Sequence, residues 1–232
     1  MLGPVSSPPS VDALVVACGN VQWDPPVDVE WLSAVPGRDE LDPLLDRLAG
    51  RRLVVCGQDA ALAAVVQRLL RLSRLDVAVG FVPFDPSSEV AALWGLPTAA
   101  GAALRVALEA DPERAPLVRD DAGGVLVGLG LIAPIRGVVY CDDEPVLRGQ
   151  ASRLEVTPDP EASSDTSKDG LLMRVRRGGL FGRRESSAAG RAVQIGCVPA
   201  FVYRDGVQHD RRSDKWTWYR HTQDWRLVRG LL

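Results

Sequence analysis

Apolar runs and helical stripes alternate along the first half of the chain. Continuous valine- and leucine-rich runs of strand length predict three buried parallel strands, over residues 12–18, 53–56 and 77–82. Apolar residues at helical spacing predict four helices, over 38–49, 59–72, 87–94 and 98–110. Residues 19–36, with their prolines, are expected to be mostly loop. This alternation favours a parallel α/β sheet with right-handed crossovers.

After about residue 115 the pattern becomes one of short, valine-rich or alternating runs separated by Gly, Pro and Asp turns. It predicts strands over 125–132, 137–141, 152–156, 171–176, 191–197, 201–204 and 215–219. Such a series is typical of an antiparallel sandwich or a curled sheet. We therefore expect a disordered lead-in over residues 1–10, an α/β domain over 11–118 and an all-β domain over 119–232. A polar mobile loop is expected at 157–169.

Ligands of open parallel sheets bind at the carboxyl ends of the strands, which here are two turns, 57–61 and 82–89. A phosphate-binding turn needs glycines, inward-turned N–H groups and often a hydroxyl. The first turn has one glycine and no hydroxyl, and in the second Pro86 lacks an N–H. Asp85 and Glu89 would repel a polyphosphate unless Mg²⁺ intervened. These residues predict weak triphosphate binding.

Both turns nevertheless resemble motifs of the bacterial diacylglycerol- and sphingosine-kinase-like lipid kinases, which are related to NAD kinases. The family's GGDGT motif is matched by residues 57–61, GQDAA, and its P-x-G-T-x-N-D-x-A-R-x-x-G-[IL]-P motif aligns without a gap to 83–97. Asp169-Gly170 matches the start of a DG-x-L motif, and Asp205-Gly206-Val207 partly matches a DGE turn. The resemblance runs from about residue 50 to 210. It implies a nucleotide-binding-like α/β domain followed by an antiparallel β-sandwich-like domain.

The resemblance also implies site residues. Asp169 would be the base toward a lipid hydroxyl, and Asp59 would belong to the nucleotide and metal site. Cofactor-binding positions would be Gly57, Asp59, Ser87, Ser88 and Glu89, with Asp59 and Asp205 as metal positions, and the cofactors would be ATP and Mg²⁺. Simpler interpretations stay open: Asp59 as a cap of its own helix, and both Asp-Gly pairs as hairpin turns, the interpretation we favour for Asp205.

The chain departs from the family at most phosphate-facing positions: Gln58, Ala60, Ala61, Asp85, Pro86 and Val207. Phosphoryl transfer depends on positioning and on neutralising the phosphates, so losing the cradle removes more than losing one side chain. We therefore expect a lipid-kinase-like protein with lost or much reduced activity that acts as a ligand-binding or regulatory module. The alternative is a divergent active lipid kinase that uses ATP and Mg²⁺.

The charge is unevenly distributed. Residues 171–232 hold 13 Lys/Arg and 5 Asp/Glu, whereas residues 1–170 hold 14 and 25. Five arginines cluster around the Leu-Phe pair at residues 180–181. Together with the phenylalanine they form a candidate lipid- or anion-binding group: Arg174, Arg176, Arg177, Phe181, Arg183 and Arg184. Farther on, Trp216, Trp218 and Trp225 lie among basic residues. The default interpretation is that these tryptophans pack within the β-sandwich. Two alternatives stay open: a surface that binds lipid and, as a second alternative function, a surface that binds nucleic acid.

The expected partners are an anionic lipid or membrane surface and a second copy of the chain, with nucleic acid less favoured. No apolar run is long enough to cross a bilayer, and the first residues lack the basic and apolar regions of a signal peptide. We expect a cytoplasmic protein, peripheral to the membrane. The four widely spaced cysteines predict free thiols.

Overall fold

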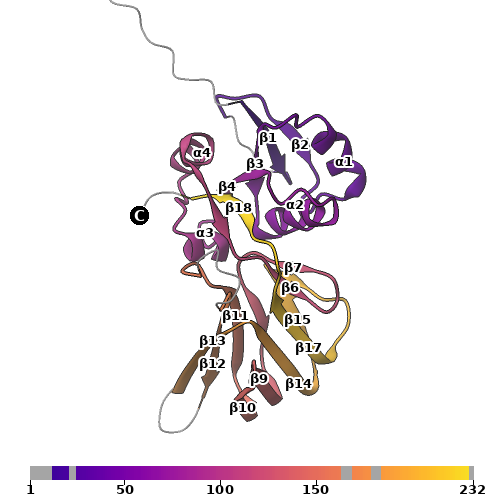
Figure 1. The fold of residues 1–232 in the computed structure, drawn as a ribbon, viewed down its shortest axis with the longest axis vertical. Helices are drawn as coiled ribbons and strands as arrows, with labels where there is room; N and C mark the ends of the chain where they lie inside the picture. The colour runs from indigo at the N-terminus through magenta and orange to yellow at the C-terminus, as the bar shows by residue number, and fades with distance from the viewer. Residues whose placement is uncertain (1–11, 21–24, 163–168, 179–183, 230–232) are drawn as a thin grey trace, which may run out of the picture.

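The computed structural model describes residues 12–20, 25–162, 169–178 and 184–229. Figure 1 shows a helix-covered sheet at one end of the molecule and a strand-rich half at the other. The predicted lead-in 1–10 lies outside the described residues, as do residues 163–168 of the predicted loop; residues 157–158 of that loop end a strand.

The first sheet has six strands in the order β2-β1-β3-β4-β18-β5, and its first four run parallel. Its strands are β1 (Ala13–Cys18), β2 (Glu30–Leu32), β3 (Arg52–Gly57), β4 (Ala78–Pro83), β5 (Pro112–Ala115) and β18 (Trp225–Val228). The three predicted buried strands are confirmed as β1, β3 and β4, all of whose residues after the first are buried. The segment 19–36 also contains the short edge strand β2.

Helices cover both faces of this sheet. They are α1 (Arg38–Asp46), α2 (Asp59–Arg71), α3 (Glu89–Trp94) and α4 (Ala100–Glu109). The buried residues of α1 and α2 share one hydrophobic cluster with Val55 and Phe81, and those of α4 pack with Val54 and Val82 on the other face. At Gly80, an added Cβ would lie 2.8 Å from the Cβ of Ala107, so α4 approaches β4 closely.

The second half consists of two antiparallel sheets, ordered β10-β9-β14-β17-β6-β7 and β13-β12-β11-β8-β15-β16. The strands of the first are β6 (Val118–Asp120), β7 (Val125–Leu126), β9 (Ile135–Cys141), β10 (Glu144–Ala151), β14 (Ala192–Ala200) and β17 (Ser213–Arg220). Those of the second are β8 (Gly130–Ile132), β11 (Arg153–Pro158), β12 (Leu171–Arg177), β13 (Arg184–Gly190), β15 (Val202–Arg204) and β16 (Val207–Gln208). One hydrophobic cluster joins buried residues of both sheets, which confirms the predicted antiparallel packing.

The tryptophans of the basic tail lie inside the protein. Trp216 and Trp218 point from β17 into the core of the second half with their ring centroids 6.0 Å apart, and Trp225 is buried too. The packed interpretation is therefore confirmed. Because the rings are covered, they offer no surface on which bases could stack.

The last strand, β18, returns to the first sheet and pairs in parallel with β4 and antiparallel with β5. Figure 1 shows it as a yellow strand beside β4. The prediction that residues 119–232 form an all-β unit on their own is wrong for this strand. Its apolar side chains explain the placement: Trp225 packs edge-on against Trp94 of α3, with centroids 6.4 Å apart.

The four cysteines are free thiols, as predicted. Burial raises the pKa of the Cys18 thiol to about 12 and that of Cys141 to about 11, so neither is a reactive thiolate near neutral pH. No helix within the described ranges is both long and apolar enough to cross a membrane.

Candidate functional site

The two turns identified from the sequence lie side by side, because β3 and β4 are neighbouring parallel strands that end at the same edge. Gly57 ends β3, but the space beside it is filled. An added Cβ would stand 3.1 Å from the Cβ of Cys18 and 3.2 Å from that of Ala61. Gly57 therefore allows β1, β3 and α2 to pack closely, and it leaves no room at its Cα for a phosphate.

Asp59 binds the start of α3. Its Oδ1 accepts a hydrogen bond from the Ser88 hydroxyl at 2.5 Å, and its Oδ2 accepts the N–H groups of Glu89 at 2.9 Å and Val90 at 3.2 Å. The residue that occupies the N-cap of α2 is Gln58. The alternative interpretation, that Asp59 caps its own helix, is therefore wrong: the carboxylate reaches across the sheet edge and satisfies N–H groups of α3.

The other predicted cofactor positions form turn and cap contacts. Ser88 is the N-cap of α3, and its Oγ accepts the Ala91 N–H at 3.0 Å. Ser87 donates its N–H and its hydroxyl to Asp85, which holds the pKa of that carboxyl below its ordinary value. The Glu89 side chain is exposed. The hydroxyls of this turn are thus engaged by acids of the chain itself.

Asp205 lies in the turn between β15 and β16, where its φ of 46° and the φ of 83° at Gly206 are both positive. That is the geometry of a two-residue hairpin turn, so the favoured interpretation is confirmed. The side chain, however, points inward. Asp205 is only 3% exposed, and it accepts the N–H groups of Val127 at 3.1 Å, Gly128 at 2.7 Å and Leu129 at 3.0 Å.

Burial raises the pKa of the Asp205 carboxyl to about 7, with a smaller contribution from the nearby Asp59 charge; the three N–H groups act in the opposite direction. Gly128 lies between these acids. An added Cβ there would stand 2.8 Å from Val90 Cγ2 and 3.1 Å from Asp205 Oδ1. The structure therefore joins Asp59, Ser88, Val90, Gly128 and Asp205 into one continuous group at the junction of the two halves.

The segment 127–129 was not predicted as part of the site. The sequence suggested a single strand over 125–132, whereas the structure has β7 at 125–126 and β8 at 130–132, with the three donors between them. Two glycines within that run, Gly128 and Gly130, were the available signal, because glycine inside a strand pattern often marks close approach of another group.

Asp169 is not brought to this group. It lies exposed just before β12, and its carbonyl oxygen accepts a hydrogen bond from the Arg220 guanidinium at 3.0 Å. Within the described ranges no hydrogen bond or ion pair joins it to Asp59, Ser88, Glu89 or Asp205. The two predicted catalytic acids, Asp59 and Asp169, therefore do not form one contact network.

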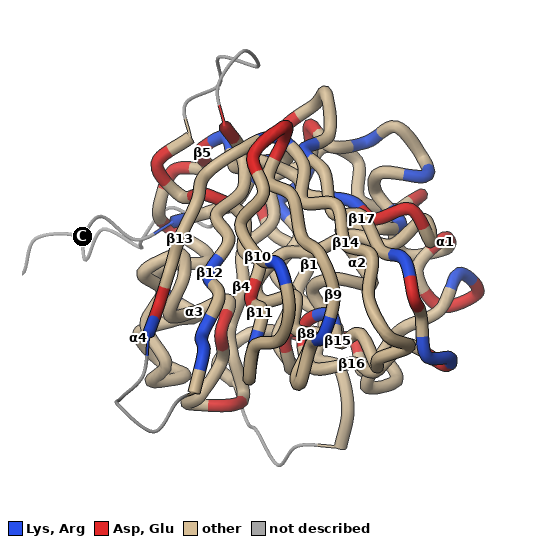
Figure 2. Tube along the Cα trace, turned by 90° about the horizontal axis from the view of Figure 1, so that it is seen from below, with Lys and Arg blue, Asp and Glu red and all other residues tan. Residues whose placement is uncertain are grey.

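Three of the predicted anion-binding arginines, Arg174, Arg176 and Arg177, are paired with other groups of the protein. Arg174 and Arg176 lie 3.0 and 3.1 Å from Glu185 of β13, and Arg176 also lies 3.5 Å from Glu155. Arg177 donates to the Val146 carbonyl at 2.9 Å, and Arg184 is exposed. Figure 2 shows basic and acidic positions interspersed rather than gathered in one basic surface. Phe181 and Arg183 lie outside the described residues.

A hollow of about 830 Å³ lies beside the acid group, between α3 and the outer face of β11, β12 and β13. It is lined by side chains of both charge signs and by small residues, including Glu89, Gly128, Arg153, Glu155, Arg174 and Ala189. A second cavity of about 430 Å³ lies at the ends of β1, β3 and β4 and is bordered by Gln58, Asp85 and Pro86.

The residues present do not fit a magnesium ion. Hard cations need several carboxylate or carbonyl oxygens turned toward one point. Both oxygens of Asp59 and both of Asp205 already accept protein donors. In the part of the chain that the structure describes, no three His, Cys, Asp or Glu side chains are placed to hold a metal together.

No protein-family model and no curated protein sequence matches the chain. Solved structures do. A putative diacylglycerol kinase from Bacillus anthracis str. Sterne is 12% identical, with a TM-score of 0.69 over 97% of this chain and 99% of that one. A second structure described as a diacylglycerol kinase from the same organism has 11% identity and a TM-score of 0.66, over 97% and 98%.

An NAD kinase from Archaeoglobus fulgidus, solved in complex with ATP, is 14% identical, with a TM-score of 0.56 over 94% of this chain and 93% of that one. These likenesses extend over nearly the whole of each chain, at identities that establish the fold alone. The chain thus has the fold shared by diacylglycerol kinases and NAD kinases, as its motifs predicted.

Proposed function

We propose that this protein keeps the diacylglycerol-kinase fold, has lost or nearly lost ATP-dependent phosphoryl transfer, and acts as a ligand-binding or regulatory module. The carrying observation is the Asp59 carboxylate, which accepts the Ser88 hydroxyl and the N–H groups of Glu89 and Val90. Donors of this kind, hydroxyls and helix-terminal N–H groups, are what a phosphate-binding turn offers to its ligand. Here the protein's own anion occupies them.

Three further features oppose a polyphosphate at this turn. Pro86 contributes no N–H, Gly57 has no free space beside its Cα, and Asp85 and Glu89 add exposed negative charge. Among the described residues no Lys or Arg is paired with Asp59 or Asp85, whose hydrogen-bond partners are hydroxyls and N–H groups, so no basic side chain is held at this turn by these acids to neutralise a phosphate. Because phosphoryl transfer depends on phosphate positioning and charge neutralisation, these features support loss of the reaction.

The hollow of about 830 Å³ at the junction supports the binding part of the proposal. Its volume is within the usual range of small-molecule sites, roughly 300–1,000 Å³. Its wall combines Arg153 and Arg174 with Glu155 and Glu89, so it suits a polar ligand better than a purely apolar one.

One observation favours the alternative, a divergent active lipid kinase. The buried Asp205 carboxyl, with its pKa raised to about 7, lies near Asp59, and an acid titrating close to neutral pH is suited to general-base catalysis. In that case ATP would supply the transferred phosphoryl group. Asp205, rather than the exposed Asp169, would then be the base toward an acceptor hydroxyl, once one of its oxygens is released from the N–H groups of Val127, Gly128 and Leu129.

The test is transfer of labelled γ-phosphate from ATP to diacylglycerol in detergent micelles with Mg²⁺, by the full chain. We expect no transfer above that of a no-protein control. Turnover that disappears in Asp59→Asn and in Asp205→Asn, but persists in Asp169→Asn, would replace our proposal with the active-kinase alternative. Turnover that all three variants share with the wild type would point to a contaminating kinase.

A further inference from the structure

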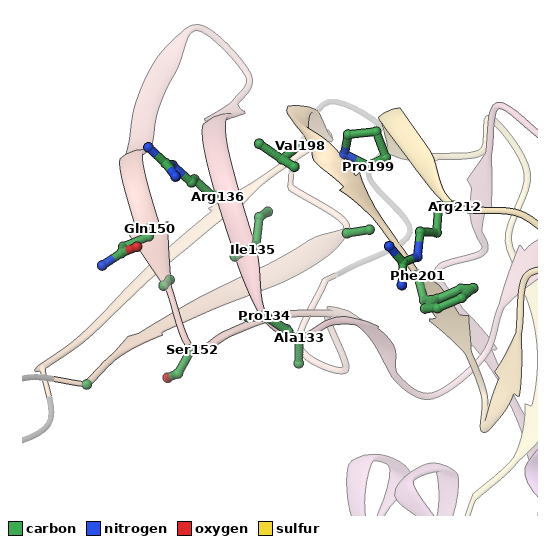
Figure 3. A pocket seen from close by; sticks show the side chains of 13 residues that line it. Ala133, Pro134, Ile135, Arg136, Gln150, Ser152, Val198, Pro199, Phe201 and Arg212 are labelled. Atoms are coloured by element: carbon green, nitrogen blue, oxygen red, sulfur yellow. The ribbon is translucent and has the colours of Figure 1, made fainter.

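A third cavity, of about 570 Å³, lies among the ends of strands that cross between the two sheets of the second half. Its wall comes mainly from the links β8–β9, β10–β11 and β14–β15, with Arg212 from the link β16–β17, and it shares no residue with the Asp59–Asp205 group. Figure 3 shows its side chains.

The wall is mainly apolar. It includes Pro134, Ile135, Ala151, Val198, Pro199 and Phe201. Val198 is 59% exposed, which is unusual for a valine in a strand with a buried face nearby. An exposed concave apolar surface of this kind gains free energy when an apolar ligand covers it.

The charged side chains of the wall are arginines. Arg136 and Arg212 border the cavity, and no Asp or Glu is among its lining residues. In Figure 3 they stand on two sides of Ile135 and Val198. The Arg212 guanidinium lies over the Phe201 ring, 4.8 Å from its centroid, so an aromatic face holds it at the edge of the apolar wall.

These two arginines differ from those of β12. Arg174 and Arg176 face Glu185 and Glu155, whereas neither Arg136 nor Arg212 has an acidic partner within 4.0 Å among the described residues. A guanidinium without a carboxylate beside an apolar wall is complementary to a carboxylate or phosphate that carries an apolar chain.

We propose that this cavity binds a single-chain anionic amphiphile, with its apolar chain against Ile135, Val198 and Phe201 and its carboxylate or phosphate head on Arg212. Arg136 supplies a second cationic side chain. This inference does not depend on the state of the Asp59 turn, because the two sites share no residue and are tested with different probes.

Isothermal titration calorimetry of the full chain with monomeric decanoate and decyl phosphate tests the proposal. Both are expected to bind, and decanol and inorganic phosphate to bind at least about tenfold more weakly. Arg212→Gln is expected to weaken decanoate about tenfold or more, since it removes a charge-assisted contact, and Arg136→Gln to weaken it less. Val198→Asp, at an exposed position, should also weaken it.

The matched control is Arg148→Gln, an exposed arginine of β10 that does not line the cavity and should leave binding unchanged. The proposal is overturned if decanoate does not bind, if decanol binds equally well, or if Arg212→Gln and Arg148→Gln behave alike. Binding to phosphatidylglycerol vesicles without binding of monomeric decanoate would overturn it too, in favour of a flat membrane contact.

Discussion

The Asp59 carboxylate accepts a hydrogen bond from the Ser88 hydroxyl at 2.5 Å, and the two residues lie at the carboxyl ends of neighbouring parallel strands. With the N–H groups of Glu89 and Val90, this contact anchors α3 to the turn after β3. Asp59 therefore has a structural role that can be measured without knowledge of any ligand.

Replacing Asp59 by alanine should lower the free energy of unfolding by about 1–2 kcal/mol, because it removes the acceptor for N–H groups at the start of α3. Urea denaturation measures this change. The control is Glu89→Gln, which alters an exposed acid one residue after Ser88 and should cost only a few tenths of a kcal/mol. Equal effects of the two substitutions would contradict the anchoring role.

Asp205 should make stability depend on pH. Its pKa in the folded protein is about 7, above the ordinary value of 3.8 for an aspartate, so the folded state holds the proton more tightly than the unfolded chain does. The contribution of Asp205 to the free energy of unfolding is fully present below about pH 4. It is lost as the pH rises toward 7, by at most about 1.4 kcal/mol per pH unit.

Urea unfolding at pH 5 and pH 7.5 measures that loss. Asp205→Asn should lose less stability between the two values than the wild type, whereas Asp210→Asn, an exposed acid nearby, should follow the wild type. If the wild type and Asp205→Asn lose the same stability between pH 5 and pH 7.5, another group titrates in this range.

Much of the first half was predictable, because parallel buried strands and amphipathic helices have distinct periodicities. The Asp59 contacts were not, since the sequence cannot tell which of two adjacent helix starts an aspartate will satisfy. The return of β18 was missed for a different reason. Trp225 and Leu227 lie in the basic C-terminal stretch, and only the three-dimensional positions of β4 and α3 give their apolar side chains partners.

The site itself was partly predictable. The motif positions Asp59, Ser88 and Asp205 do come together, whereas within the described residues no hydrogen bond or ion pair joins Asp169 to them. Two of the predicted arginines, Arg174 and Arg176, are paired with Glu185, which faces Arg176 across the β12–β13 pair. Sequence charge alone could not reveal that pairing, because it depends on strand register.

Freeing those arginines should create an anion-binding face. Glu185→Gln removes the acidic partner of Arg174 and one of the two acidic partners of Arg176. Each arginine freed in this way adds about 1 kcal/mol of attraction to an anionic membrane. We expect several-fold tighter binding to phosphatidylglycerol vesicles in a sedimentation assay at low salt. Glu144→Gln, an exposed acid of β10, is the control; if it has the same effect, net charge alone explains the gain.

The close approach of α4 to β4 gives a test of the fold. Gly80→Ala places a Cβ 2.8 Å from Ala107 and should cost about 1–3 kcal/mol through overpacking. Gly101→Ala, in α4 with open space around it, should instead be neutral or stabilising by up to about 1 kcal/mol. Thermal unfolding of both variants compares the two, and a harmless Gly80→Ala would mean that α4 does not pack on β4 as described.

The central claim is that the protein's own carboxylate fills the turn where a nucleotide phosphate would bind. Isothermal titration of the full chain with ATP, with and without Mg²⁺, tests it most directly. We predict no saturable binding at millimolar nucleotide under either condition. Saturable ATP binding that Asp59→Asn abolishes, while Glu89→Gln preserves it, would contradict the claim.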